Sequence, residues 1–550
     1  MPEYLSPGVY VEEVDRGPKP IEGVGTAMAV FIGFTEKAQL VEQSNGETLT
    51  RDLLGKPQLV TNWSQYVERF GSFVGGAYLP HSVYGYFQNG GSRCYVVSVK
   101  TIPKAQAALL NGEGKPALVA RAKQAGFDGL RLRVKVEVPP AAAGDEGKKA
   151  KGKEGEGAAP AAGAADGGTP FTVTVEREKT TGGWMTQEVL RDVTLAEMQK
   201  EDGAKMAGVA YKDNKAPQLI DLVVPDPSAP LAKLWPREQQ QSLSIESKLL
   251  SAATATDFQG EVTERTGVEG LESIDDITMV VVPDLMTMMP GQKLDLHMVK
   301  AVQSMIIAHC EKMGDRVAVL DAPPSMSPQA VKKWRMDAAG YDSSYAALYY
   351  PWLEVNDPVT NRPINVPPSG HAAGIWARSD NTRGVHKAPA NEVVRGATGL
   401  ANNVTKGEQD TLNPIGVNCI RAFPGMGIRV WGARTLSSNP SWRYINVRRL
   451  FNFVEKSIER GTQWVVFEPN EPRLWGRVRR DVSAFLGLVW RDGALFGLTP
   501  EQAYYVKCDE ELNPSASRDL GRLIIEIGLA PVKPAEFVIF RISQWQPGAE

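Results

Sequence analysis

The sequence predicts a multidomain protein that combines an α/β domain, an α+β domain and a β-rich insertion. Three observations support this fold class: the length of 550 residues, the alternation of apolar strand segments with amphipathic helices beyond residue 260, and a long polar segment near residue 150. A chain of this length exceeds what one hydrophobic core supports, so about two to four domains are expected. The apolar content of 42% and the charged content of 23% are ordinary for globular proteins.

Residues 21–105 and 261–400 are predicted to form one α/β middle domain. Continuous apolar strands between amphipathic helices imply a largely parallel sheet that is covered on both faces. In chain order we expect a strand at 26–34, a helix at 61–70, and strands at 92–99 and 277–283, then a helix at 294–313, a strand at 316–320, a helix at 328–338 and a strand at 345–351.

Residues 106–260 are predicted to be a peripheral, β-rich insertion. The segments 130–138 and 171–177 alternate between apolar and polar residues with period two, and we expect them to pair as a hairpin. The segment between them, 139–170, contains no aromatic and no branched aliphatic residue, so it cannot offset the entropy cost of ordering. It is predicted to be a disordered loop at the hairpin tip.

Residues 401–530 are predicted to form an inner, C-terminal α+β domain. Two long helices are expected at 442–460 and 472–490, each with apolar residues spaced for one face. Two strands, at 503–508 and 522–529, are expected to follow them.

Two short strand-like segments, 8–14 and 537–543, are separated from the rest of the sequence by proline and glycine. Residues 1–20 and 531–550 are therefore predicted to be arms. A lone strand cannot bury its apolar side or satisfy its backbone groups, so each segment should join a sheet in its own subunit or in a neighbour. The residues expected to make these contacts are Val9, Tyr10, Val11, Val14, Phe537, Val538, Phe540 and Ile542.

Composition argues against several functional classes of protein. The net charge of −3 gives no general reason to expect nucleic-acid binding. The apolar runs are too short for a membrane span, and the first residues lack a signal-peptide pattern. Neither a metal site nor a cofactor is predicted. The four scattered cysteines are expected to be reduced, buried thiols, at Cys94, Cys310, Cys419 and Cys508.

Some residues of the predicted α/β middle domain could belong to a catalytic site. Asp284 and Asp321 each follow an apolar strand, where open α/β sheets bind ligands, but aspartate also commonly ends strands and caps turns. No glycine-rich phosphate loop accompanies either residue. The stretch PSGHAAG at 368–374 resembles the subtilisin family around its nucleophile, yet aligning His371 on that family places Val366 at the nucleophile position.

Because a triad needs a hydroxyl, a base and a carboxylate together, we predict a subtilisin-like scaffold without an active site. An α/β hydrolase or protease-like enzyme that uses Asp284, Asp321 and His371 remains the alternative.

Several short motifs resemble the contractile tail sheath family of bacteriophages and related injection systems. In this sequence they are SPGVYVEEV at 6–14, PPSGHAAG at 367–374, RSD at 378–380, RGVHKAPAN at 383–391, NPIGVN at 413–418, WGARTL at 431–436 and YINVRR at 444–449. They span nearly the whole chain except the segment from 106 to 260.

This resemblance implies a structural, non-enzymatic subunit without cofactors. Hexameric rings would stack into a helical sheath around an inner tube protein, and contraction triggered at the baseplate would drive the tube through a target envelope. N- and C-terminal arms would exchange strands between subunits. Further partners would be baseplate proteins and tail-terminator or cap proteins, with no nucleic acid and no membrane insertion. Assembly would take place in the bacterial cytoplasm, as part of a phage tail or a tail-like particle.

Basic residues cluster on the two predicted C-terminal helices. A solvated helix face is the ordinary explanation, but a basic face in a near-neutral protein can also dock an acidic partner. With the resemblance, the candidates to face the inner tube are Arg448, Arg449, Arg473, Arg477 and Arg480.

Overall fold

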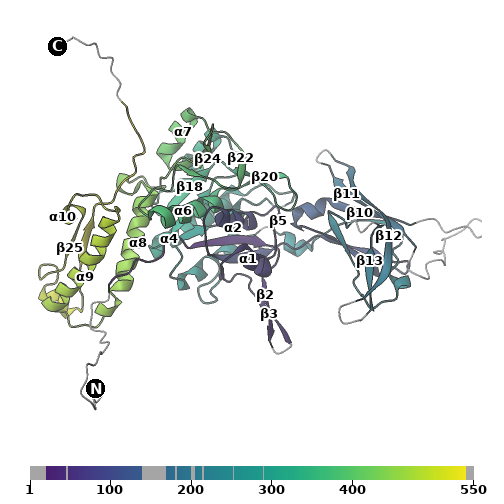
Figure 1. Ribbon diagram of the computed structural model, residues 1–550, viewed down its shortest axis with the longest axis horizontal. Coiled ribbons are helices and arrows are strands. Elements are labelled where there is room, and N and C mark those ends of the chain that lie inside the picture. Colours follow the sequence, from purple (N-terminus) through teal and green to yellow (C-terminus); the bar gives the residue numbers. More distant parts are fainter. Residues whose placement is uncertain are drawn as a thin grey trace, which may run out of the picture.

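The computed structural model describes residues 20–44, 47–138, 169–179, 182–199, 205–212, 216–251, 253–288 and 290–540. Three units follow one another along the long axis of the molecule (Figure 1): a C-terminal unit around α8 and α9, a central unit, and a β-rich unit that contains β10 to β13. This arrangement is the mixed α/β, multidomain architecture that the sequence predicts.

A nine-stranded sheet forms the middle of the central unit. Its six inner strands are parallel, and antiparallel strands flank them on both edges. Across the sheet the order is β21 (Glu392–Val393), β24 (Gly427–Val430), β23 (Val417–Phe423), β18 (Ala346–Tyr350), β17 (Val317–Asp321), β16 (Met279–Val281), β1 (Ala29–Thr35), β6 (Cys94–Thr101) and β4 (Gln58–Val60).

Helices cover both faces of this sheet, as the continuous apolar strands require. Alternate residues of β1 point into different cores: Phe31 lies in the same core as Tyr86 and Trp376 on one face, while Val30 lies in the same core as Val302 on the other. The first face is covered by α1 (Trp63–Phe70), α2 (Leu79–Gln88) and α6 (Ser369–Arg383). The second is covered by α3 (Ala255–Gln259), α4 (Leu296–Met313), α5 (Pro328–Lys333) and α7 (Lys406–Leu412).

The insertion contains two antiparallel sheets. The larger has the order β13 (Lys205–Ala210), β12 (Trp184–Gln199), β11 (Phe171–Glu178), β10 (Leu132–Glu137) and β15 (Gln239–Ser242). The smaller has β14 (Ile220–Val223), β8 (Pro116–Ala122) and β7 (Gln106–Leu110). Val134 lies opposite Val175, which confirms the predicted pairing on either side of the polar segment. Residues 139–168 of the predicted loop lie outside the described residues.

Smaller elements complete these two units. A hairpin of β2 (Gln39–Ser44) and β3 (Glu47–Asp52) projects from the central unit. A three-stranded sheet contains β20 (Pro363–Val366), β19 (Leu353–Asn356) and β22 (Ala397–Leu400), and β5 (Val74–Gly75) pairs with β9 (Ala125–Gly126) to join the central unit to the insertion.

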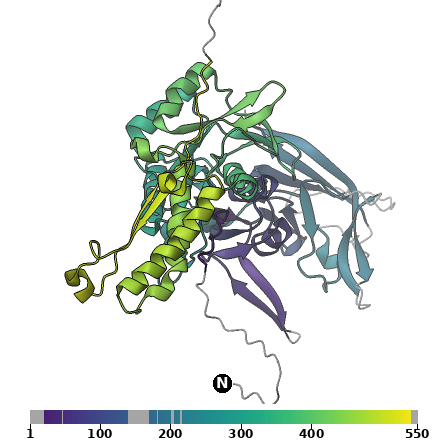
Figure 2. The same ribbon diagram turned by 60° about the vertical axis from the view of Figure 1, so that its left-hand side comes forward.

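The C-terminal unit is built on two long amphipathic helices, α8 (Ile445–Gly461) and α9 (Pro472–Arg491). These helices lie next to each other and come forward in Figure 2. Leu450 and Val454 of α8 share a core with the apolar face of α9, including Val478 and Leu486. The unit also contains α10 (Pro500–Ala503), β25 (Tyr504–Lys507), α11 (Ser515–Asp519) and β26 (Glu526–Leu529), and β25 pairs with β26.

The boundary predicted at residue 400 is wrong. Strands β23 and β24 lie beyond it, yet both belong to the central sheet, where β23 runs parallel to β18. Because Leu348 pairs with Val417, this part of the chain is held by contacts with a strand far earlier in the sequence. The central unit therefore continues to the segment that precedes α8.

The four cysteines are all free and buried, as predicted. Within the described part of the chain, no helix combines the length and the apolar character needed to cross a membrane.

Candidate assembly site

Helix α8 joins the C-terminal unit to the central unit. One side of the helix packs on α9, while Ile445 at its start belongs to the core beneath the central sheet. Polar residues are buried along with the apolar ones, including Asn446, Arg448, Arg449 and Ser457. Buried polar groups need partners, so these side chains indicate where α8 is fixed to its surroundings.

Arg449 makes the strongest of these connections. Its guanidinium is 4% exposed and binds both carboxylate oxygens of Asp380 on α6, at 2.9 and 2.5 Å. It also donates to the backbone oxygen of Thr26 at 3.0 Å, and the Thr26 hydroxyl donates to Asp380 at 2.7 Å. A two-point, charge-assisted pair of this kind fixes orientation as well as distance. It links α6, α8 and the residues that lead into β1.

Arg448 is equally enclosed. Its guanidinium lies 4.3 Å from the ring centre of Trp442 and 4.6 Å from that of Tyr345, and it donates to Asn452 at 2.7 Å. Both arginines are therefore used inside the subunit. The structure leaves neither of them at the surface, where a contact with a tube would require them.

The other three predicted basic residues are exposed on α9. Arg477 lies over the ring of Trp464, with 4.4 Å between the guanidinium carbon and the ring centre, and Arg480 is 3.6 Å from Asp481. Arg473 lies one turn before Arg477, because residues four apart share one side of a helix. These three residues form the basic face of α9.

The segment of residues 20–28 crosses α8 before it enters β1. The Val24 amide donates to the Ser457 hydroxyl at 3.1 Å. Gly23 lies so close to Phe453 that a Cβ atom there would come within 2.9 Å of the ring. A predicted N-terminal arm would thus leave from a fixed point on α8. The arm residues Val9, Tyr10, Val11 and Val14 lie outside the described residues.

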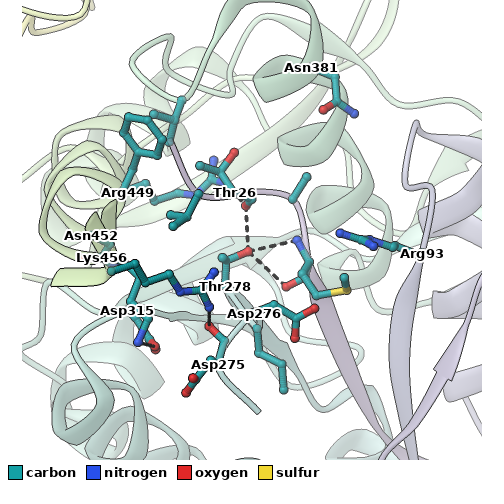
Figure 3. Close-up of a pocket in the computed structure, with 18 of the residues that line it drawn as sticks. Thr26, Arg93, Asp275, Asp276, Thr278, Asp315, Asn381, Arg449, Asn452 and Lys456 are labelled. Atoms are coloured by element: carbon teal, nitrogen blue, oxygen red, sulfur yellow. Dashed lines mark hydrogen bonds and ion pairs between the residues drawn. The ribbon is translucent and has the colours of Figure 1, made fainter. Parts of the chain in front are cut away.

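A cleft of about 300 Å³ lies beside this crossing, between α8 and the residues that lead into β1 and β16 (Figure 3). Lys456 reaches Asp315 at 3.4 Å, Arg460 donates to the backbone oxygen of Asp275 at 3.1 Å, and Thr278 donates to that of Thr26 at 2.7 Å. The first two contacts join α8 to the central unit, and the third links the residues that lead into β1 and β16 on the opposite wall. The cleft is thus part of the joint between the two units.

The C-terminal segment presents apolar side chains to solvent. Phe537, Val538, Ile539 and Phe540 are 71%, 70%, 80% and 83% exposed, and they belong to no helix or strand of the subunit. Contiguous exposed apolar residues generally mark an interaction surface. Ile542, the last predicted contact residue, lies outside the described residues.

The acids of the catalytic alternative have structural roles. Asp284 is buried and accepts hydrogen bonds from the Thr287 hydroxyl and from the backbone N–H groups of Phe34, Tyr78 and Leu79. Burial raises the pKa of Asp284, and the backbone hydrogen bonds oppose that rise. The side chain thereby ties the end of β1 to the start of α2, where a carboxylate also suits the helix dipole.

Asp321 and His371 are both buried in the central unit. Asp321 accepts the amide of Ser369 at 2.8 Å and its hydroxyl at 2.5 Å, and burial raises the pKa of Asp321 to about 7. Burial lowers the pKa of His371 to about 4. Within the described residues, no hydrogen bond joins His371 to either aspartate, and no three His, Cys, Asp or Glu side chains are grouped to hold a metal.

Two family models match this chain, and the boundary between them agrees with the division into a central unit and a C-terminal unit. Residues 266–436 match the model of the phage tail sheath protein central domain, and residues 437–544 match that of the phage tail sheath C-terminal domain. Together the two matches cover about half of the sequence, and they meet where the structure ends the central unit. The chain belongs to the contractile tail sheath family.

Curated relatives carry the same description. A protein described as a prophage major tail sheath protein of Pseudomonas aeruginosa (strain UCBPP-PA14) is 27% identical over 316 residues, which cover 55% of this chain and 77% of that protein. The tail sheath protein of Escherichia phage P2 is 24% identical over 327 residues, which cover 58% and 77%.

Solved structures show the shared fold over nearly the full length. The sheath complex of the extracellular contractile injection system PVC, in its contracted state, matches with a TM-score of 0.54 and 22% identity, covering 99% of both chains. A chain of the anti-feeding prophage (AFP) baseplate matches with the same score and identity, covering 99% of this chain and 100% of that chain.

Proposed function

We propose that this protein is the structural subunit of a contractile sheath and has no catalytic role. Six copies form a ring, the rings stack around an inner tube, and contraction drives the tube through a target cell envelope. Membership of the tail sheath family, across both domains from residue 266 to 544, is the observation that carries this proposal. The α/β hydrolase alternative is not favoured, because Asp284, Asp321 and His371 have the structural surroundings described above.

The energy for contraction is stored in the packing of the subunits. Two arrangements of the same rigid bodies differ in free energy, and the extended arrangement is the metastable one. Neighbouring subunits stay connected through residues 1–20 and 531–550, whose strands add to a sheet in the next subunit. The exposed run from Phe537 to Phe540 supports this role, because burying it in a neighbour removes apolar surface from water.

The partners follow from this assembly. They are other copies of the chain, an inner tube protein, baseplate proteins and a tail-terminator or cap protein. We place assembly in the bacterial cytoplasm, within a phage tail or a tail-like particle. The subtilisin-like character of the central domain remains a prediction.

Electron microscopy of the purified full-length protein tests the proposal. Tubes or stacked rings are expected. Dispersed particles with hydrolytic activity would instead support the α/β hydrolase alternative.

The basic face of α9 is the proposed contact with the tube. The double variant Arg477→Glu, Arg480→Glu should weaken co-assembly with the tube protein by about tenfold, because each reversed charge adds like-charge repulsion at the interface. Sedimentation of mixtures at low salt measures this effect. The double variant Arg191→Glu, Arg237→Glu is the control, since it changes the net charge equally on the exposed surface of the insertion. Equal co-assembly of both double variants contradicts the assignment.

The polar segment of residues 139–170 should be dispensable for assembly. Glu137 and Thr172 lie opposite each other in the β10–β11 pair, so a short turn can replace the segment without separating the strands. Tubes of unchanged length and diameter are expected in micrographs of the shortened protein. Loss of tubes by a protein that still folds would assign this segment a role in assembly.

A further inference from the structure

Three sequence motifs that lie apart along the chain converge on the carboxylate of Glu536. Asn413 Nδ2 donates to Oε1 at 2.7 Å, and the Tyr444 hydroxyl donates to Oε2 at 3.1 Å. Arg434 contacts both oxygens, with Nε at 2.9 Å from Oε1 and Nη2 at 2.6 Å from Oε2. Four donors therefore surround one side chain of the C-terminal segment.

This binding site for Glu536 is itself fixed to the central sheet. Arg434 is 8% exposed, and its backbone amide and carbonyl bind the side chain of Asn418 on β23 at 2.7 and 2.8 Å. Arg434 also donates to the Asn413 backbone oxygen at 3.3 Å. Burial alone would raise the pKa of Glu536, but the hydrogen bonds from its three partners and the charge of Arg434 hold that pKa below its ordinary value. Such charge-assisted contacts are about twice as strong as neutral ones.

The residues just before Glu536 are held as well. Phe496 and Ala494 on the C-terminal unit exchange backbone hydrogen bonds with the chain at Ala530 and Val532, at 2.7 and 3.2 Å. Asn446 at the start of α8 donates to the Val532 oxygen at 3.2 Å. These contacts end at Glu536, and residues 537–540 after it are exposed. The Glu536 side chain is 19% exposed, whereas the next residue, Phe537, is 71% exposed.

We propose that Asn413, Arg434 and Tyr444 anchor Glu536, and that this anchor sets where and in which direction the C-terminal arm leaves the subunit. The inference rests on the proposed exchange of arms between subunits. Glu536 is a positioning residue, and the apolar residues after it make the contact with a neighbour. An arm held at its root loses less conformational freedom when it binds, so anchoring favours assembly.

The anchor also connects the two arms. Tyr444 and Asn446 at the start of α8 hold the C-terminal segment, while Arg449 and Ser457 farther along the same helix hold residues 24–26. A force on one arm is therefore transmitted to the attachment point of the other arm through a single 17-residue helix. The bodies of the subunits can then reorient as rigid units between neighbours that remain linked.

The test compares Glu536→Ala with the control Lys533→Ala in the full-length protein. Lys533 is exposed on the same segment and forms no polar side-chain contact among the described residues. Hydrogen exchange at residues 530–536 of the unassembled subunit should become about tenfold faster or more in Glu536→Ala, because charge-assisted hydrogen bonds are lost. Exchange in the central sheet should not change. Assembled tubes should be several-fold shorter, and Lys533→Ala should match the wild-type protein in both measurements.

Equal exchange at residues 530–536 in Glu536→Ala and Lys533→Ala overturns the anchor. Shorter tubes without faster local exchange overturn it too, since the defect would then arise elsewhere. If Glu536→Ala fails to fold, Tyr444→Phe decides the question, because it removes one hydrogen-bond donor and keeps the ring. Tyr444→Phe should give a smaller increase in hydrogen exchange at residues 530–536. The absence of any increase would count against the anchor. A protein truncated after Glu536 tests the exchange of arms separately. Normal tubes from that truncated protein would refute the proposed arm contact. The hydrogen-exchange measurements on Glu536→Ala would still decide whether the anchor exists.

Discussion

Replacement of Asp380 by alanine should lower the free energy of unfolding of the subunit by about 3 to 5 kcal/mol. The change leaves the guanidinium of Arg449 buried without its carboxylate partner. Arg449 would keep only the backbone oxygen of Thr26 among its hydrogen-bond acceptors. Removing one member of a buried ion pair is costly because the remaining charge stays out of water.

Urea unfolding of the unassembled subunit, followed by tryptophan fluorescence, measures this loss. Glu455→Ala is the matched control, since Glu455 pairs with Arg448 but its side chain is 54% exposed and Arg448 keeps Asn452 and its aromatic neighbours. A loss below about 1 kcal/mol is expected for the control. Equal losses in the two variants would mean that the Arg449–Asp380 pair does not hold the two units together.

Truncation after Glu536 should abolish ordered assembly while the subunit still folds. The deletion removes the exposed run from Phe537 to Phe540 and the rest of the predicted strand, but it spares the anchor and all the core clusters. A neighbour would lose both the apolar contact and the main-chain hydrogen bonds of an added strand. Sedimentation and negative-stain microscopy would detect the loss of tubes, and circular dichroism would report on the fold.

Removal of residues 545–550 alone is the control for this truncation, because it leaves the predicted strand intact. Normal tubes are expected from the control. Deletion of residues 1–20 should also prevent assembly, since the N-terminal arm serves the same link from the other side. Tubes of normal length from the protein truncated after Glu536 would show that the C-terminal arm is not needed.

Local sequence patterns predicted most of the architecture. The period-two alternation before and after residues 139–170 correctly predicted β10 and β11, and the apolar stripes correctly predicted α8 and α9. The domain boundary failed because β23 is placed by its pairing with β18, a contact between distant parts of the chain. The sequence of a strand does not identify a partner that lies far away along the chain, so neither segment indicated this pairing.

The candidate site was predictable only in part. The apolar run near residue 537 was visible in the sequence, and the structure exposes it. By contrast, nothing near Arg449 in the sequence indicates its burial, because its partner Asp380 is 69 residues away. The partners of Glu536 lie 92 to 123 residues away. Their motifs were recognisable as family features, but their shared contact is a property of the fold.

Cryo-electron microscopy of tubes assembled from the full-length protein tests the central claim most directly. The account predicts density for residues 537–542 as a strand hydrogen-bonded into a sheet of an adjacent subunit, with Glu536 still held by Arg434 of its own subunit. Density that folds residues 537–542 back onto their own subunit, with adjacent subunits in contact only through other surfaces, would contradict it.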